Sequence, residues 1–368
     1  MGRVIDTSSG DTVRRIKKVG RYHLALFLLP VCSLLFYGWL RAPHLNERPD
    51  NPQRIAPLHL RGRILDKSGR PLADTVNETR TYPQGASAGS LVGYQLRGRN
   101  HTGLEASIQH RLSPPLPPAT LAAAFSQDRQ FEEGERPRLR GPDVRLTLDA
   151  ELQRKLYEAL LPSAGAVVVS DERGQVLAAV SSPSFDPNKV RENWQTLRDD
   201  ERGPFIERVG SGFYPVTGPD GEPLVSEAEL KGHNWMSSEP FPEYPGGSSA
   251  VFVDDRLFLT PLMMLEMAYW TSGREQAPSL RLLADSQDSE SASKELPLPK
   301  LEVSEREGVL SFDGPSFQKS PAFLAMVGWR DGLYFAVVVE SADAQGRLAS
   351  ERVLDILTGQ VGGKKGGR

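Results

Sequence analysis

A run of 19 residues without acidic or basic charge divides the N-terminus of this 368-residue chain from the rest. From Tyr22 to Leu40 the sequence reads YHLALFLLPVCSLLFYGWL. A helix rises about 1.5 Å per residue, so this run is about long enough to cross the hydrocarbon core of a bilayer. Five basic residues precede it and predict a cytoplasmic N-terminus: Arg14, Arg15, Lys17, Lys18 and Arg21. We therefore expect a polar cytoplasmic tail without regular structure over residues 1–21, a single-pass inner-membrane anchor over 22–40, and the bulk of the chain in the periplasm or outside the cell.

Two other interpretations of this run stay open. A cleaved signal peptide would need small residues at a cleavage site, and none stand in small-x-small spacing before Arg41. Lipid attachment at Cys32 would need small residues before it, and Pro30-Val31 is bulky. The uncleaved anchor is the favoured prediction.

Composition excludes several classes of function. Net charge is −3 and the isoelectric point is about 6.1, which argues against a nucleic-acid binder. Cys32 is the one cysteine, so neither an internal disulfide nor a cysteine-built metal site is possible. The six histidines are scattered without ligand spacing. We expect no metal and no cofactor.

The region after the anchor predicts a small β-rich domain. Two apolar runs flank Asp66-Lys67-Ser68-Gly69 in RGRILDKSGRPLADT, which indicates a hairpin. Arg80-Thr81-Tyr82-Pro83 follows, then Leu91-Val92-Gly93-Tyr94, then Gly103-Leu104-Glu105. A Pro- and Arg-rich linker, with PPLPP and ERPRLRGP, leads to about residue 142.

From Asp143 onwards the pattern predicts a mixed α and β domain. Asp149 is placed as the N-cap of a helix with Leu152, Leu156 and Leu160 on one face. GAVVVSD and GQVLAAVSS predict a hairpin, as do AFLAMVGW and GLYFAVVVES around residues 330–332. Thr260 and Pro261 open an apolar helix to Trp270, and RLASERVLDIL predicts an amphipathic helix. The polar stretch from 275 to 302 reads as loop.

These pieces, in this order, resemble class B penicillin-binding proteins. The pieces from Arg61 to Glu105 match that family's non-catalytic pedestal, and DVRLTLDAELQRKL through NWQTLRDDERGPFIERVGSGFYP match the opening of its transpeptidase domain. The resemblance implies an α+β chain with a small β-rich pedestal. It also implies a penicillin-binding/serine β-lactamase-like domain, an antiparallel sheet flanked by helices. The expected boundaries are 41–142 for pedestal and linker, 143–360 for the transpeptidase-like domain, and 361–368 for a flexible tail.

The catalytic motifs that the resemblance implies are missing. The family continues Tyr-Pro-Pro-Gly-Ser-x-x-Lys, whereas here Tyr214 and Pro215 lead into Val216-Thr217-Gly218-Pro219-Asp220. A serine needs a neighbouring base to become a nucleophile. Tyr214, Pro215 and Thr217 are therefore interpreted as a vestigial nucleophile elbow. The second motif, Ser-x-Asn, does not occur in the chain.

The third motif, Lys-Thr-Gly on an edge strand, is replaced in our alignment by Pro315-Ser316-Phe317. Ser316 with Lys319 is the least poor alternative catalytic pair, since its spacing is Ser-x-x-Lys. Such matches are expected by chance in a chain of this length. Only 44 residues, 216 to 259, stand where the family places a helical subdomain.

The favoured hypothesis is an inactive homologue that acts as a scaffold or regulator of peptidoglycan synthesis. The resemblance implies the membrane and a glycan polymerase of the shape, elongation, division and sporulation (SEDS) class as partners. An active serine D,D-transpeptidase or carboxypeptidase with relocated residues is the alternative. A sensor that binds peptidoglycan peptides without covalent chemistry is a third hypothesis.

Overall fold

The computed structural model describes most of the chain in segments, and every structural statement below concerns these residues. They are residues 9–36, 58–96, 101–114, 138–216, 244, 250–253, 256–274, 276–285, 294–295, 309–314, 323–341 and 343–359. The chain forms two compact units, Met1–Leu58 with Pro115–Leu139 and His59–Pro114 with Arg140–Arg368.

The first unit contains helix α1, Ser9–Leu35. The prediction that residues 1–21 lack regular structure is wrong for residues 9–21, which are helical because this basic stretch contains no proline and continues directly into the apolar run. Among the described residues, no helix has both the length and the apolar content needed to cross a membrane. Residues 37–40 of the predicted anchor lie outside that part of the chain.

The N-terminal part of the second unit, residues 59–114, lies within the predicted pedestal region 41–142 and is called the pedestal below. Its sheet has the order β4-β3-β2-β6, and β1 pairs with β5. The hairpin predicted around Asp66–Gly69 is confirmed, because β2 and β3 are antiparallel and Gly69 takes a positive φ of 84° in the turn. The strands are β1 Leu58–Leu60, β2 Ile64–Leu65, β3 Pro71–Val76, β4 Thr79–Thr81, β5 Arg138–Arg140 and β6 Val144–Arg145; the helices are α4 Ala86–Val92, α5 Gly103–Ser107 and α6 Gln109–Leu112.

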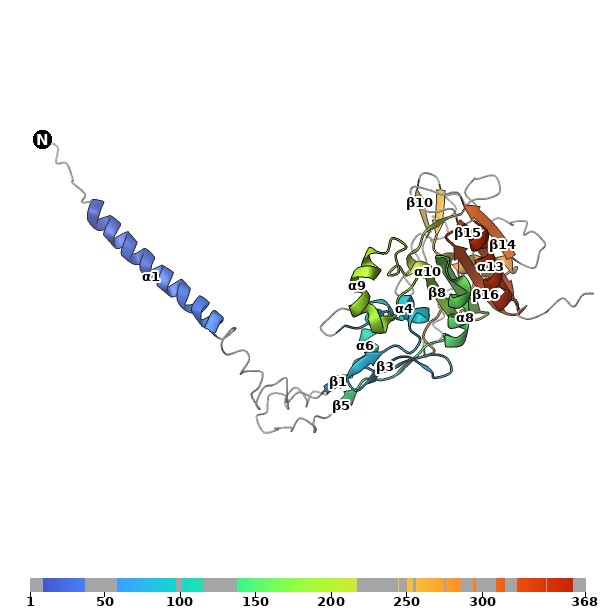
Figure 1. Cartoon of the computed structure of the whole chain (residues 1–368), viewed down its shortest axis with the longest axis horizontal. Coiled ribbons are helices and arrows are strands. Elements are labelled where there is room, and N and C mark those ends of the chain that lie inside the picture. Colours follow the sequence, from blue (N-terminus) through green and yellow to red (C-terminus); the bar gives the residue numbers. More distant parts are fainter. Residues whose placement is uncertain are drawn as a thin grey trace, which may run out of the picture. The chain divides into compact units, whose positions relative to one another are not determined.

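The remainder of the second unit, residues 140–359, is built on a five-stranded antiparallel sheet of order β14-β15-β16-β7-β8. Both predicted hairpins are confirmed as β7–β8 and β15–β16 (Figure 1). Asp331 and Gly332 form the second turn, both with positive φ. The strands are β7 Gly165–Asp171, β8 Val176–Ser182, β14 Val309–Gly314, β15 Phe323–Arg330 and β16 Leu333–Val339.

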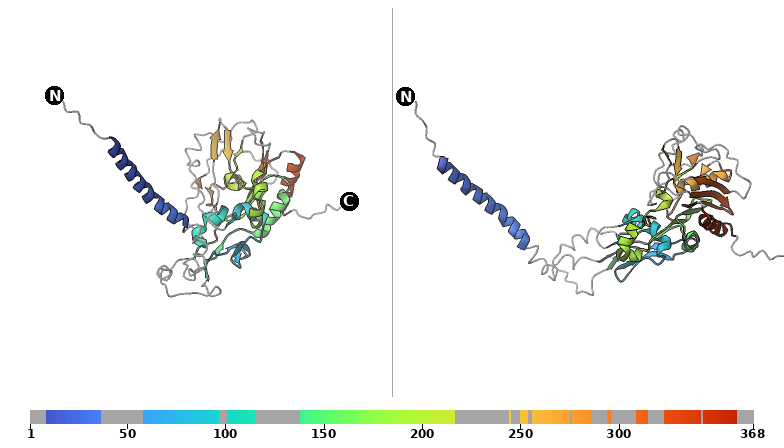
Figure 2. Two further views of the ribbon diagram at one scale, coloured as in Figure 1. Left: turned by 60° about the vertical axis from the view of Figure 1, so that its left-hand side comes forward. Right: turned by 45° about the horizontal axis from the view of Figure 1, so that its top comes forward.

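Alternating residues of this sheet face two separate sets of helices. Val167 and Val169 pack with α8 (Ala150–Leu160) and α13 (Ala344–Leu357), whereas Ala166 and Val168 belong to the core that contains α12 (Pro261–Thr271). Helices α8 and α13 lie side by side on one face (Figure 2). The expected antiparallel sheet flanked by helices is therefore present.

Two predicted helix starts are confirmed by their caps. The Asp149 carboxylate accepts from the amides of Glu151 and Leu152, at 2.9 and 3.2 Å, at the start of α8. The Thr260 hydroxyl accepts from the Met263 amide at 3.4 Å, with Pro261 at the first position of α12. The predicted C-terminal helix is present as α13, which begins at Ala344, before the predicted stretch, and is capped by Asp343.

Smaller elements fill the region between β8 and α12. They are η2 Pro187–Lys189, α9 Val190–Asp199, α10 Arg208–Ser211, β9 Tyr214–Pro215, β10 Ala250–Val253 and β11 Arg256–Leu259. The prediction of loop over 275–302 is wrong in part, because β12 Gln276–Ala277 pairs with β13 Lys294–Glu295. The two strands are far apart in the sequence and only two residues long, so no local pattern predicts their pairing.

Candidate functional site

The elbow residues Tyr214 and Pro215 form strand β9 rather than the entry to a helix. Leu259 and Phe258 of β11 pair with them in antiparallel register. The strand geometry continues one residue further, since the Val216 amide donates to the Leu257 carbonyl at 2.8 Å and Val216 is fully buried. The residue after Tyr-Pro is thus an apolar part of a small sheet. Thr217 lies outside the described residues.

An ion pair between Arg208 and Glu340 binds the side chain of the elbow residue Tyr214. The Tyr214 hydroxyl donates to Glu340 Oε1 at 2.8 Å, and Arg208 Nε donates to the same oxygen at 2.8 Å. Arg208 also donates to the carbonyls of Gly203, at 3.1 Å, and of Arg202. Burial, together with the Glu340 carboxylate, raises the pKa of Tyr214 well above its ordinary value. This hydroxyl stays protonated and serves as a donor.

A second carboxylate, Glu207, lies next to this pair and is half-buried. It caps α10 by accepting from the Val209 and Gly210 amides at 3.1 and 2.7 Å. The hydroxyls of Ser181 and Tyr244 donate to it at 3.3 and 2.9 Å. Burial raises the pKa of Glu207, and the four donors oppose that shift without cancelling it. Ser181 is fully enclosed, so this serine–carboxylate contact has no access to a substrate.

The helix that starts beside the elbow, α12, has an apolar first turn. Because Leu259 pairs with Tyr214, the N-terminus of α12 lies next to β9. Its first residues after Pro261, Leu262, Met263 and Met264, are fully buried apolar side chains. A nucleophile at a helix start needs an exposed hydroxyl with a base one turn later. The start of α12 has neither.

The edge strand of the main sheet is β14, which reads VLSFDG and contains no lysine. It ends at Gly314, directly before the residues predicted to replace the third motif. Pro315, Ser316 and Phe317 lie outside the described residues, as does Lys319. The assignment of these positions, including the alternative Ser316–Lys319 pair, stays a prediction.

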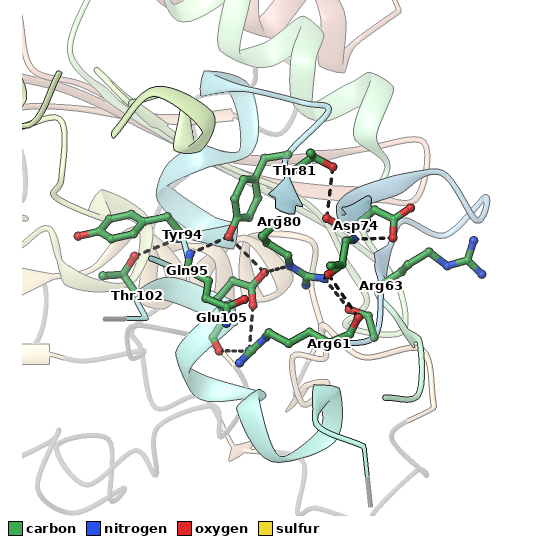
Figure 3. Close-up of polar contacts among 12 residues, drawn as sticks. Arg61, Arg63, Asp74, Arg80, Thr81, Tyr94, Gln95, Thr102 and Glu105 are labelled. Atoms are coloured by element: carbon green, nitrogen blue, oxygen red, sulfur yellow. Dashed lines mark hydrogen bonds and ion pairs between the residues drawn. The ribbon is translucent and has the colours of Figure 1, made fainter. Parts of the chain in front are cut away.

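Three of the four motif pieces of the pedestal meet at one buried carboxylate, Glu105 (Figure 3). Glu105 has no exposed surface, and its two oxygens contact Arg80 Nε at 2.6 Å and Arg61 Nη2 at 2.9 Å. Tyr82 donates to it at 3.4 Å and accepts from the Gln95 amide at 2.7 Å. These pieces are far apart in the sequence, and the ion pairs and hydrogen bonds at Glu105 join them in the folded pedestal.

This pedestal cluster is charged but closed. Burial lowers the pKa of Arg61, although Glu105 acts in the opposite direction. The Arg80 and Arg61 side chains are 5% and 10% exposed. Both cations already have a carboxylate partner. The arrangement is that of a structural cross-link between β4, α5 and the chain before β2. Among the described residues no group of three His, Cys, Asp or Glu side chains could hold a metal.

Comparison with known proteins gives a consistent class. No family model matches the chain. Peptidoglycan D,D-transpeptidase MrdA of Escherichia coli is 41% identical over 93 residues, 24% of this chain and 14% of MrdA. Peptidoglycan D,D-transpeptidase PbpA of Mycolicibacterium smegmatis is 29% identical over 222 residues, 54% of this chain and 44% of PbpA. The chain thus spans less than half the length of these curated relatives.

Solved structures match over most of the chain. PBPA from Mycobacterium tuberculosis superimposes with a TM-score of 0.57 and 17% identity over 81% of this chain and 99% of that one. Pseudomonas aeruginosa PBP2 in complex with WCK 5153 superimposes with a TM-score of 0.57 and 16% sequence identity. This match covers 82% of this chain and 96% of that one. The relatives and structural neighbours are class B penicillin-binding proteins. The chain has the penicillin-binding-protein transpeptidase fold, a mixed α and β architecture.

Proposed function

We propose that this chain is a membrane-anchored, catalytically inactive homologue of class B penicillin-binding proteins that acts as a scaffold or regulator in peptidoglycan synthesis. One observation carries the proposal. The fold is retained, yet the residue after the Tyr-Pro elbow is Val216, buried and hydrogen-bonded in a sheet. In this proposal the apolar run 22–40 anchors the chain in the inner membrane, with the N-terminus in the cytoplasm.

The chemistry of acyl transfer supports this view. A serine hydroxyl attacks only when a base can take its proton, and an oxyanion site must stabilise the intermediate. Losing one of these groups costs several kcal/mol of transition-state stabilisation, on the order of 3–4 kcal/mol for a single oxyanion donor. The sequence lacks Ser-x-x-Lys at the elbow, Ser-x-Asn throughout, and lysine on the described edge strand β14.

The pedestal supports the scaffold role. Its motif residues Arg61, Arg80 and Glu105 form a closed cross-link, so this part of the chain keeps a buried core of its own without any catalytic motif. Relatives are named peptidoglycan D,D-transpeptidases, which supports the proposal of a role in cell-wall synthesis. We propose a glycan polymerase of the SEDS class as partner and the pedestal surface as the contact.

Labelling with a fluorescent penicillin tests inactivity directly. We expect no covalent adduct on the purified full chain, while E. coli MrdA, treated in parallel, is labelled. A β-lactam ester mapped to any serine by mass spectrometry, Ser316 included, would contradict the proposal. That result would favour the alternative of an active D,D-transpeptidase or carboxypeptidase.

Co-purification with a glycan polymerase tests the partner. Val76, at the end of β3, is 50% exposed, and Leu348, on α13, is 55% exposed. We expect Val76→Asp in the pedestal to weaken co-purification and the matched Leu348→Asp to leave it unchanged. Equal retention by both variants would remove the pedestal from the contact. Recovery of peptidoglycan peptides in place of a polymerase would favour the sensor hypothesis.

A further inference from the structure

The pedestal and the transpeptidase-like domain share a polar junction, and two of its side chains, Gln153 and Asp66, are fully buried. We infer that residues 59–114 and 140–359 are one cooperative folding unit without a hinge, so that the pedestal cannot turn independently of the transpeptidase-like domain. This inference does not depend on whether the chain is catalytically active. It follows from three sets of contacts across the junction.

Gln153 of α8 makes the first set. Its side-chain amide donates to the carbonyls of Ser87 in α4 and Ala179 in β8, at 2.9 and 2.7 Å. Its side-chain oxygen accepts from the Ala179 amide at 2.8 Å. Gln153 is 1% exposed. Rotation of the pedestal relative to the other domain would leave the Ser87 carbonyl and one hydrogen of the Gln153 amide buried without a partner, which is strongly unfavourable.

The turn of the β2–β3 hairpin makes the second set, at the start of α8. The Lys67 amide donates to the Leu148 carbonyl at 2.8 Å. The Lys67 ammonium contacts the capping carboxylate of Asp149 at 2.9 Å, and buried Asp66 accepts from the Ala150 amide at 3.4 Å. The β2–β3 hairpin turn of the pedestal therefore also supplies part of the N-terminal cap of α8, a helix of the transpeptidase-like domain.

Helix α4 makes the third set by close backbone approach. A Cβ atom at Gly89 would lie 1.9 Å from the Phe185 carbonyl oxygen, so only glycine fits. The next amide, at buried Ser90, donates to Ser184 Oγ at 3.1 Å. The backbone of Tyr82 is bound on both sides by the Asn188 side chain, at 2.9 and 2.8 Å.

The hydrophobic core is continuous across the same junction. One cluster of buried side chains contains Ile64 and Leu91 of the pedestal together with Leu148, Ala166 and Phe185 of the transpeptidase-like domain. The parallel pairing of Ile64 with Val144 also extends the pedestal sheet into the second domain. Separating the domains would expose this apolar surface and the buried amides together. Partial opening would therefore lose core contacts of both domains as well as buried hydrogen bonds.

Two site-specific probes on the full chain test this inference. In a Cys32→Ser background, fluorophores at Val76→Cys and at Leu348→Cys report on the pedestal and on α13, both from exposed positions. We expect denaturant unfolding to give the same midpoint and slope with both probes. A separate, earlier transition of the pedestal probe would overturn the inference, and this comparison needs no destabilising variant.

A variant pair sharpens the result. Gln153→Ala removes the amide that joins α4 to β8, so we expect it to lower both midpoints by the same amount. Gln195→Ala on the exposed face of α9 is the matched control and should change neither. If Gln153→Ala shifts the pedestal probe and leaves the α13 probe in place, the two domains unfold separately and the inference fails.

Discussion

The pedestal and the elbow each contain a buried ionic cluster, but the balance of charge is reversed. In the pedestal two guanidinium groups, Arg61 and Arg80, share the Glu105 carboxylate. Beneath the elbow two carboxylates, Glu207 and Glu340, lie near one guanidinium, Arg208. Burial accordingly lowers the pKa of Arg61 and raises that of Glu207. Both clusters bind backbone segments: Arg61 and Arg80 donate to the carbonyls of Glu105 and Gly62, and Glu207 accepts from the amides of Val209 and Gly210.

The two clusters differ in how much stability the loss of one partner should cost. The pedestal cluster depends on one carboxylate, so removing it leaves two cations unpaired. The elbow cluster distributes its bonds over hydroxyls, amides and an ion pair. It has kept this support although the nucleophile that would follow Pro215 is absent from the sequence. The scaffold of the elbow therefore has a structural value separate from catalysis.

The largest effect is expected for Glu105→Gln. Breaking a buried ion pair by removing one partner costs about 3–5 kcal/mol, and here two guanidinium groups lose their counter-charge. The free energy of unfolding, measured by denaturant titration, should fall by that order. The matched control is Glu158→Gln, whose exposed pair with Arg154 contributes less than about 1 kcal/mol. Equal effects of the two variants would show that the pedestal cluster has no special weight.

Arg208→Met should have the next largest effect. Methionine keeps the apolar length of the side chain but removes the Arg208 donor from Glu340 and from the Gly203 carbonyl. Because Glu340 keeps some access to water and the Tyr214 hydroxyl, we expect a loss of about 3 kcal/mol, at the lower end of the range for buried pairs. Arg202→Met, at a 63% exposed side chain, is the control. A loss larger than that of Glu105→Gln would invert the comparison.

Tyr214→Phe removes one donor to Glu340 and leaves Arg208 in place. A single hydrogen bond to a charged group contributes about 1.5–3 kcal/mol, and the remaining ion pair lessens the loss towards about 1 kcal/mol. Thermal or denaturant unfolding measures this difference. An unchanged or increased stability would mean that the elbow hydroxyl is not a structural tie.

The pH dependence of stability gives the smallest but most specific effect. With a folded-state pKa raised above the ordinary value near 4.5, Glu207 binds its proton more tightly when folded. Its contribution is therefore present at low pH and is lost as pH rises from about 4.5 through the folded pKa. Glu207→Gln should remove this decline, by at most about 1.4 kcal/mol per pH unit.

Asp143 should change stability with pH in the opposite direction from Glu207. The bond from Arg63 lowers the pKa of Asp143, so its contribution is lost as pH falls below the ordinary aspartate value. Asp143→Asn should therefore flatten the acid side of the stability profile, and Glu207→Gln the side above pH 4.5. Identical profiles for the two variants would contradict the assigned shifts.

Local signals in the sequence predicted most elements of the second unit. The cap at Asp149, the two hairpins of the main sheet and Pro261 at the start of α12 depend on residues close in sequence, and all are confirmed. The contacts of Glu105 with Arg61 and Arg80 span 44 and 25 residues, and no local pattern predicts that they meet. The pairing of β12 with β13 was missed for the same reason.

At the elbow, sequence reasoning could establish which residues are absent but not what replaces their geometry. The missing serine and lysine were evident from the residues after Pro215. The pairing of β9 with β11 and the burial of Val216 follow from contacts with residues about 40 positions later. The positions predicted for Thr217, Ser316 and Lys319 lie beyond the described residues and stay predictions.

The burial of Val216 has a consequence for any attempt to install the family's chemistry in this chain. In the order Tyr-Pro-Pro-Gly-Ser-x-x-Lys, Val216 takes the place of the second proline, and the serine and lysine fall at Gly218 and Gly221. A hydroxyl introduced at position 216 would enter the β9–β11 strand pair, because Val216 is fully buried and its amide bonds the Leu257 carbonyl. If the chain is inactive as proposed, acyl transfer would need a serine and a base introduced together at positions 218 and 221, and exchange of Val216 alone would supply neither.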